Sequence, residues 1–460
     1  MLLQKMKNLF LLLMVLLCIL LGSQVWLKLP EFLNYDLEKD NVANKKEIPE
    51  TNIWNVVKPL KSIIKYKDNY TVLYTDEYNF WNKTVSILTE GLKSYSEGNI
   101  SYTDSVVFPT QYLKLDFPTN MPIKIFTKHM GINNESLVDN INNIKNIIID
   151  LDKRNTIYIY NGVDTYKFEN DTINTESINT TIENLDFNKH TKYSIDEKIG
   201  EDKINIPLPL EEYALNPVFV QSELDVFDTE EINKIAKNYF KNNYEYVRKS
   251  VELNGNRVYM YRTEKVLKIQ AEGLLDFYNS MIDLEKSQDV YDSLMSALVF
   301  IEDFLGFPKD GYLSNIEIIQ YEGTYGYRFT FSYKILNRPI MFSKVRENAA
   351  LEIDVIGDGV VSYKRFIRNI DESQRDEMKD IQVLPAIEVI NKNLQNEETS
   401  QEELKPLKKE MIKDISNVYL GYFDLSRISK EQVLRVVWVV EIGNRSYIFN
   451  AIRGSLIEEW

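Results

Sequence analysis

The longest apolar stretch of the chain lies at its N-terminus, where residues 9–29 are interrupted by very few polar side chains. At about 1.5 Å per residue, roughly twenty apolar residues cover the ~30 Å hydrocarbon core of a bilayer. A helix in a soluble core would not be apolar on every side. The pattern therefore predicts one transmembrane helix over residues 9–29, preceded by a short tail over residues 1–8.

Charges on either side of this stretch predict its orientation. Lys5 and Lys7 precede it, whereas acidic residues prevail after it, namely Glu31, Asp36, Glu38 and Asp40. The positive-inside rule then places residues 1–8 in the cytoplasm and the bulk of the chain outside a single-pass cell membrane protein.

A cleaved signal peptide is the alternative interpretation of the same residues, because Gly22-Ser23 offers a small-residue cleavage site. The apolar run continues past that point to Trp26 and Leu29, which favours a retained helix. A lipoprotein is disfavoured, since Cys18 follows leucines rather than small residues.

The next segment, residues 30–50, is polar and lacks periodicity, which is typical of a linker. An N-terminal domain is expected over residues 51–215. Within it, residues 70–74 alternate like a strand, and Trp81 opens a run of helical spacing that reaches Leu92. Residues 156–168 predict a hairpin that turns at Asn161-Gly162.

Beyond residue 215 one pattern occurs three times: an amphipathic helix followed by a meander of strands. A middle domain is expected over residues 216–285, with Asp228 at the start of its helix. A C-terminal domain of two such units is expected over residues 286–460, with helices near residues 290–305 and 385–394. The predicted fold class is α+β, a multi-domain ectodomain of helices packed on antiparallel sheets after one transmembrane helix.

Composition narrows the classes of function. The 460-residue chain has a formal net charge of −15 and a pI of about 4.9, and its field repels phosphate backbones. Nucleic acid is therefore excluded as a partner. The single cysteine, Cys18, lies in the apolar stretch, so no disulfide is expected in the remainder of the chain.

No pattern of residues indicates catalysis, a cofactor or a metal site, and we expect a protein that is not an enzyme. His129 and His190 lack metal-ligand spacing and are expected at the surface. Gly357-Asp358-Gly359 beside Asp354 is expected to be a hairpin turn rather than a calcium loop. Tyrosines on the predicted strands fit strand propensity better than a glycan or peptide groove.

The order of these segments resembles the YycH family of membrane-anchored regulators of the WalK (YycG) sensor kinase. The resemblance rests on the single span, Val57-Lys58-Pro59, the strand over residues 68–74 and Trp81. The C-terminal strands, residues 434–441 and 447–454, are also similar to YycI and to PepSY-like modules.

The resemblance implies regulation by contact between transmembrane helices in a two-component system for cell-wall homeostasis of Gram-positive bacteria. It implies a WalK-like sensor histidine kinase and a YycI-like protein as partners, and it allows a homodimer. The residues expected to make the contacts lie in the predicted helix, namely Leu13, Leu17, Cys18, Leu21 and Gly22.

Two alternatives remain open at this point. One is an extracytoplasmic PepSY-like binding module that restrains a peptidase or recognises cell-wall material. The other is a wall-active enzyme that uses a pair of carboxylates, which sequence cannot single out in an acidic chain.

Overall fold

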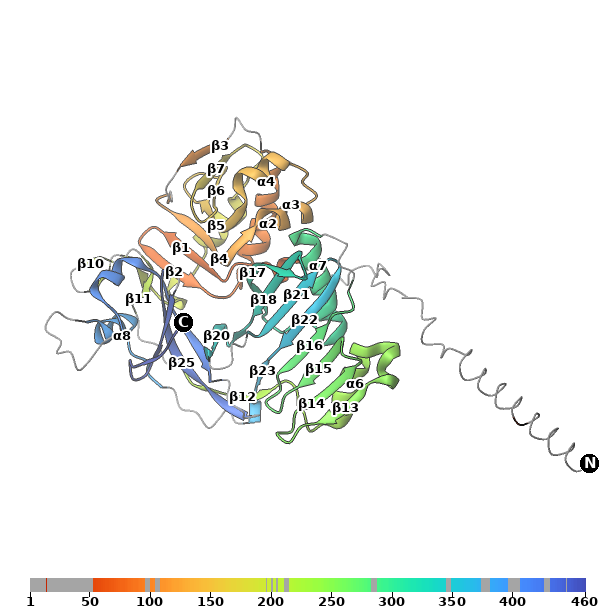
Figure 1. Ribbon diagram of the computed structural model, residues 1–460. Coiled ribbons are helices and arrows are strands. Elements are labelled where there is room, and N and C mark those ends of the chain that lie inside the picture. Colours follow the sequence, from red (N-terminus) through yellow and green to blue (C-terminus); the bar gives the residue numbers. More distant parts are fainter. Residues whose placement is uncertain are drawn as a thin grey trace, which may run out of the picture. The chain divides into compact units, whose positions relative to one another are not determined.

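The computed structural model describes Met14 and most of the chain from residue 53 onward (Figure 1). The described ranges are 53–95, 100–103, 108–195, 197–199, 202–203, 206–210, 215–282, 288–344, 349–373, 381–395, 406–425, 431–443 and 445–460. The predicted contact residues Leu13, Leu17, Cys18, Leu21 and Gly22 lie outside the described residues, as does nearly all of the predicted span. No helix within the described ranges has both the length and the apolar character needed to cross a membrane.

The first sheet has seven antiparallel strands in the order β2-β1-β4-β5-β6-β7-β3. They are β1 (Lys61–Tyr66), β2 (Asn69–Leu73), β3 (Ile100–Thr103), β4 (Tyr112–Pro122), β5 (Asn143–Asp150), β6 (Thr156–Tyr160) and β7 (Thr165–Glu169). The predicted hairpin is confirmed: Gly162 has φ 105°, and the Asn161 side chain accepts hydrogen bonds from the N–H groups of Val163 and Asp164.

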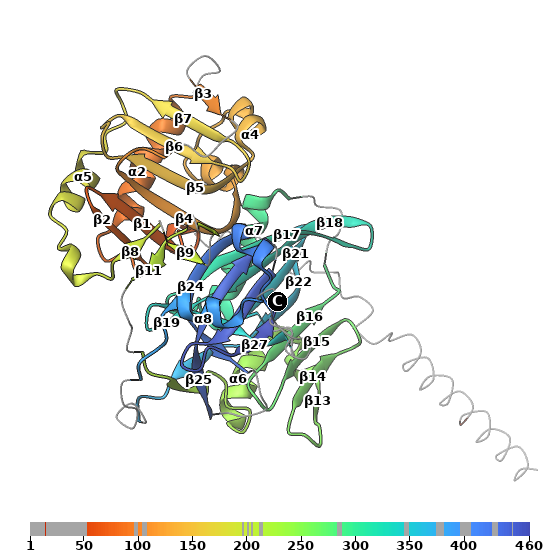
Figure 2. The ribbon, with the colours of Figure 1, turned by 90° about the vertical axis from the view of Figure 1, so that its left-hand side faces the viewer.

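Four α-helices of the described chain accompany this sheet: α2 (Phe80–Lys93), α3 (Ile123–His129), α4 (Glu135–Ile141) and α5 (Glu176–Glu183) (Figures 1 and 2). Their apolar side chains pack with those of one sheet face. Trp81 lies edge-on to Trp54 and Phe117, and its indole N–H donates to the carbonyl of Trp54 at 3.0 Å. Burial of these large rings supplies much of the packing energy of the region.

The second sheet has eight antiparallel strands in the order β13-β14-β15-β16-β22-β21-β18-β17. They are β13 (Arg248–Val251), β14 (Arg257–Tyr261), β15 (Lys265–Ile269), β16 (Leu275–Asn279), β17 (Tyr312–Tyr321), β18 (Thr324–Ser332), β21 (Leu351–Ile356) and β22 (Gly359–Arg365). Strands from both sides of the boundary expected at residue 285 thus share one sheet.

Two helices, α6 (Thr229–Phe240) and α7 (Val290–Phe304), pack on one face of the second sheet. Asp228 caps α6 by accepting from the N–H groups of Glu230 and Glu231, as the sequence predicts. Tyr239 of α6 stacks on Phe304 of α7 at 4.0 Å and contacts Phe277 of β16. These rings join both helices to the same sheet.

The third sheet is mixed and contains β12, β19, β20 and β23 to β27. The bounds are β12 (Val218–Ser222), β19 (Lys334–Ile335), β20 (Arg338–Phe342), β23 (Arg368–Ile370), β24 (Ile415–Asp424), β25 (Glu431–Ile442), β26 (Arg445–Asn450) and β27 (Leu456–Glu459). Helix α8 (Ala386–Asn393) follows the predicted stripe. Among the named strands, the expectation of antiparallel pairing is wrong for β20 and β24, which are parallel.

Four further strands are two residues long: β8 (Tyr193–Ser194), β9 (Lys198–Ile199), β10 (Asp202–Lys203) and β11 (Leu208–Pro209). They form two short antiparallel pairs, β8 with β11 and β9 with β10.

The first and third sheets share a hydrophobic cluster, which we call the inter-sheet core. Its buried residues from the first part of the chain are Ile63, Val72, Tyr74, Tyr112, Ile148, Tyr158 and Tyr193, and those from the C-terminal strands are Tyr419, Phe423, Val437, Val439 and Ile448. Alternate residues of β25, such as Trp438, pack on the opposite side near α8, where its indole N–H donates to Leu384 O. Residues 52–460 form one compact unit.

The α+β fold of helices on largely antiparallel sheets is confirmed. The division into domains at residues 215 and 285 stays a prediction.

Candidate functional site

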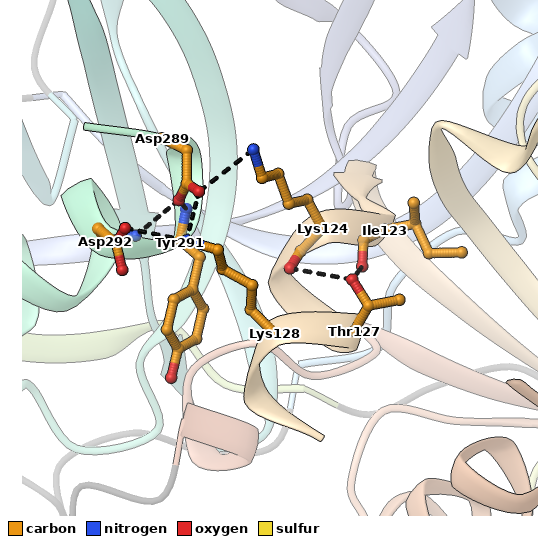
Figure 3. Close-up of polar contacts among 7 residues, drawn as sticks. All are labelled: Ile123, Lys124, Thr127, Lys128, Asp289, Tyr291 and Asp292. Atoms are coloured by element: carbon orange, nitrogen blue, oxygen red, sulfur yellow. Dashed lines mark hydrogen bonds and ion pairs between the residues drawn. The ribbon is translucent and has the colours of Figure 1, made fainter. Parts of the chain in front are cut away.

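Charged side chains join helix α3 to the N-terminal end of α7, and we call this the α3–α7 contact. Lys128 lies between two carboxylates: its Nζ is 2.9 Å from Asp292 Oδ2, and it also pairs with Asp289. Lys124 Nζ lies 3.2 Å from the same Asp289 carboxylate. Figure 3 shows both lysines of α3 extending toward the start of α7.

Local sequence explains this geometry. Lys124 and Lys128 are four residues apart, so they lie on one side of α3. Asp289 is the N-cap of α7 and accepts from the backbone N–H groups of Tyr291 at 3.0 Å and Asp292 at 3.1 Å. Its carboxylate is therefore held by the helix end and by two lysines at once.

Electrostatics at the contact favour the charged forms. Partial burial acts to raise the pKa of Asp289, but hydrogen bonds from Lys128, from the Asp292 N–H and from Lys124 outweigh it, so the pKa lies below its ordinary value. The hydrogen bond to Asp289 correspondingly raises the pKa of Lys128. Because the Lys128 side chain is 36 % exposed, each of its ion pairs contributes at most about 1 kcal/mol.

The ring of His129, at the end of α3, lies between Tyr291 of α7 and Trp54. His129 Nδ1 lies 3.3 Å from Tyr291 Oη, and its ring meets Trp54 edge-on at 5.0 Å. His129 is exposed, as the sequence predicts. Partial covering of the ring lowers the pKa of His129, which favours the neutral imidazole.

The other histidine lies in a different place. His190 Nε2 is 2.7 Å from Tyr78 Oη and its Nδ1 is 3.8 Å from a Glu77 carboxylate oxygen. Within the described ranges, no group of three His, Cys, Asp or Glu residues could hold a metal ion. Gly357 and Asp358 form the tight turn between β21 and β22, as the sequence predicts. Asp354 forms a two-point ion pair with Arg328 at 2.7 and 2.8 Å.

Two lysines, one partly buried and one buried, lie at a second place where distant segments of the chain meet. Lys334 of β19 donates to Leu60 O at 2.8 Å and also to Tyr74 O. Burial lowers the pKa of Lys334 to about 7, and the nearby Lys58 acts in the same direction. Lys61 of β1 is buried, donates to the Asn417 side chain of β24 and lies 3.7 Å from Asp116.

Comparisons with known proteins relate the chain to one family. Residues 4–192 match the family model described as "YycH protein, N-terminal domain". The fold is similar to the crystal structure of YycH from Bacillus subtilis, with a TM-score of 0.53, 15 % identity, and coverage of 88 % of this chain and 95 % of that chain. The chain thus resembles the YycH family, by sequence over residues 4–192 and by fold over most of its length.

Two more solved structures have lower similarity. An uncharacterized protein from Eubacterium rectale ATCC 33656 has a TM-score of 0.37 and 13 % identity, with coverage of 56 % of this chain and 92 % of that one. The C-terminal domain of Bacillus megaterium YpeB has a TM-score of 0.28 and 12 % identity, with coverage of 50 % and 96 %. No curated protein sequence matches.

The match over residues 4–192 relates the chain to a family of regulators of the WalK (YycG) two-component system. The regulatory class agrees with the sequence expectation. Sequence reasoning missed the α3–α7 contact. The spacing of Lys124 and Lys128 and the capping position of Asp289 were visible signals, but nothing in the sequence pairs the two helices.

Proposed function

We propose that the chain modulates a WalK-like sensor histidine kinase through its N-terminal membrane helix, residues 9–29, together with a YycI-like partner. The observation that carries the proposal is the extent of the family match, which begins at residue 4 and so includes the whole apolar segment. In this proposal residues 1–8 are cytoplasmic and the three sheets are extracytoplasmic.

Helix geometry narrows the contact surface. Residues spaced by four lie on one side of a helix, so Leu13, Leu17 and Leu21 would form a stripe. Cys18 and Gly22 border that stripe and are small enough to allow a close helix crossing. The kinase is treated as a two-state enzyme whose equilibrium this stripe biases by binding one state better than the other.

The test replaces Leu13, Leu17 and Leu21 with alanine in the full-length chain and measures kinase autophosphorylation in membranes. The matched control replaces Leu12, Leu16 and Ile19, which a helix would place on the other side. We expect the first variant to shift kinase output toward that of membranes lacking the protein and the control to behave as wild type. Equal effects of both variants would overturn the proposed stripe.

A co-purification experiment tests the partners. The full-length protein, extracted in mild detergent, should recover the kinase and a second single-span protein, and the stripe variant should lose them. Recovery of neither by the wild-type protein would contradict the proposed function.

A further inference from the structure

Strand β13 (Arg248–Val251) is one edge of the second sheet, and all four of its residues are exposed. Both ribbon views place it at the margin of that sheet (Figures 1 and 2). Large apolar side chains near this edge are also exposed: Tyr246 by 72 %, Val251 by 67 % and Phe227 by 70 %. An edge of this kind presents unpaired backbone groups to any strand that can align with it.

The hydrogen-bond pattern shows which backbone groups face outward. Glu252 N–H donates to Asn256 O at 2.8 Å, and β13 pairs with β14 in the register Ser250 opposite Val258. Because antiparallel ladders alternate, the even-numbered residues of β13 bond to β14. The N–H and C=O groups of Lys249 and Val251 therefore point away from the sheet.

Those outward groups suit a second copy of the same strand. If a twofold axis passes through the Ser250 pair, Lys249 of one copy lies opposite Val251 of the other, and these two residues form two backbone hydrogen bonds. The axis generates a second, identical pair, so the two strands share four backbone hydrogen bonds. Ser250 then faces Ser250 in a pair without backbone hydrogen bonds, where side chains approach most closely.

Pairing of charged side chains favours this register over the registers shifted by one residue in either direction. With the axis at Ser250, Arg248 lies opposite Glu252 of the second copy, on the same face of the sheet. A register with the axis at Lys249 would place two lysines opposite each other, which is unfavourable. A register with the axis at Val251 would move Arg248 away from Glu252 to face Asn254.

Arg248 and Glu252 are both able to form this ion pair between two copies. Arg248 is exposed and has no ion-pair partner within the described part of the chain. Glu252 is kept ionised because hydrogen bonds from Asn256 and Lys268 lower its pKa. A guanidinium from a second copy would add to this arrangement across the new pair.

We propose that β13 pairs antiparallel with β13 of a second copy about a twofold axis at Ser250, so that two eight-stranded sheets become continuous. The interface is small, and confinement of two chains to one membrane raises their effective concentration. This inference goes beyond the proposed kinase contact and does not depend on it, because the pairing residues lie in the second sheet. It shares with the proposed function only the confinement of the chain to a membrane.

Disulfide trapping in the full-length chain tests the register. Cys18→Ser removes the single natural cysteine, and Ser250→Cys then places one thiol on the axis. A pair without backbone hydrogen bonds has a Cα–Cα distance of about 4.5 Å, within the range a disulfide bridges. Val251→Cys is the matched control. In this register the Cα atoms of the two copies of residue 251 are offset by two residues along the strand and lie more than about 8 Å apart, which is beyond the range that a disulfide bridges.

We expect mild oxidation in membranes to cross-link Ser250→Cys about tenfold more than Val251→Cys. Adding Arg248→Glu should weaken the cross-link because two carboxylates then face each other, and combining it with Glu252→Arg should restore it. Equal cross-linking of the two cysteine variants, or no response to Arg248→Glu, would overturn the proposal.

A second variant keeps the test independent of cysteine chemistry. Val251→Pro removes an outward N–H without touching the β14 ladder, and proline is tolerated at that kind of edge position. In detergent, sedimentation of the full-length wild-type protein at increasing concentration should show a dimer that Val251→Pro loses. A wild-type protein that stays monomeric, together with absent cross-linking in membranes, would also overturn the proposal.

Discussion

At the scale of single residues, the most unusual group is Lys334, a partly buried lysine whose ammonium group meets two backbone carbonyls. Its pKa of about 7 lies well below the ~10.4 of an exposed lysine, so between these values the unfolded chain binds more protons than the folded one. The free energy of unfolding should then rise with pH, by up to about 1.4 kcal/mol per unit.

The corresponding prediction concerns Lys334→Met. From pH 7 to 9 the wild-type free energy of unfolding should increase, and the variant should lose part of that slope whatever its stability at pH 7. Urea titrations at several pH values measure the free energy of unfolding and hence its slope against pH. Lys189→Met is the control, since that side chain is 78 % exposed, and an identical slope in all three proteins would contradict the assignment.

A second residue-scale prediction concerns the fully buried pair Arg368 and Asp424, whose side chains are 3.3 Å apart and both 0 % exposed. Asp424 also accepts from the Gln432 amide. Asp424→Ala leaves a buried guanidinium without its carboxylate and should cost about 3–5 kcal/mol. Chemical denaturation measures this cost, and the exposed Asp139→Ala should cost under about 0.5 kcal/mol.

At the scale of elements, the α3–α7 contact depends on one carboxylate. Asp289→Ala removes the cap of α7 and one partner of each lysine, so we expect a loss of about 1–2 kcal/mol. Asp292→Ala should cost less than about 1 kcal/mol, because Asp292 is 48 % exposed and pairs with Lys128 alone among the described residues.

The pH dependence of this contact has the same sign as that of Lys334, but it lies in the acidic range. The pKa of Asp289 is lowered in the folded chain, so its contribution is complete above the ordinary Asp value of about 3.9 and is lost as the pH falls through the folded value. Hydrogen exchange of α3 amides should accelerate in Asp289→Ala near neutral pH. Unchanged exchange in α3 would indicate that the contact does not hold this helix.

Elements also show where sequence reasoning succeeds and where it stops. Helix α6 follows from Asp228 and the apolar stripe behind it, because both signals are local. The full extent of strand β17 does not follow from the sequence, since exposed residues such as Ile318 interrupt the alternation of apolar and polar positions. The pairing of β16 with β22 could not be predicted, because periodicity indicates where a strand lies but not which strand it pairs with.

The candidate site shows the same limit. Lys128 and Asp289 are 161 positions apart in the sequence, and charged residues are common in this chain. Their pairing follows from the fold and not from either local pattern. The predicted membrane stripe, in contrast, rests wholly on sequence and on the family.

At the scale of the whole molecule, the inter-sheet core joins early strands to late ones. Val437 and Val439 of β25 pack in one cluster with Ile63 of β1 and Ile148 of β5. Val437→Asp would place a charge in this cluster without a partner, and we expect loss of cooperative unfolding or of folding altogether. Exposed Val163→Asp is the control and should fold normally, as judged by circular dichroism and thermal unfolding.

The inter-sheet core also has a consequence for the order of folding. The first sheet can form its own ladder early in synthesis, but the face bearing Ile63 and Ile148 lacks the apolar side chains of β24, β25 and β26 until residues beyond 415 have been made. Contacts separated by so much sequence close slowly and leave apolar surface exposed meanwhile. A chain that stops before β24 should therefore be aggregation-prone. The inter-sheet core forms only when the last strands of the chain pack on the first sheet.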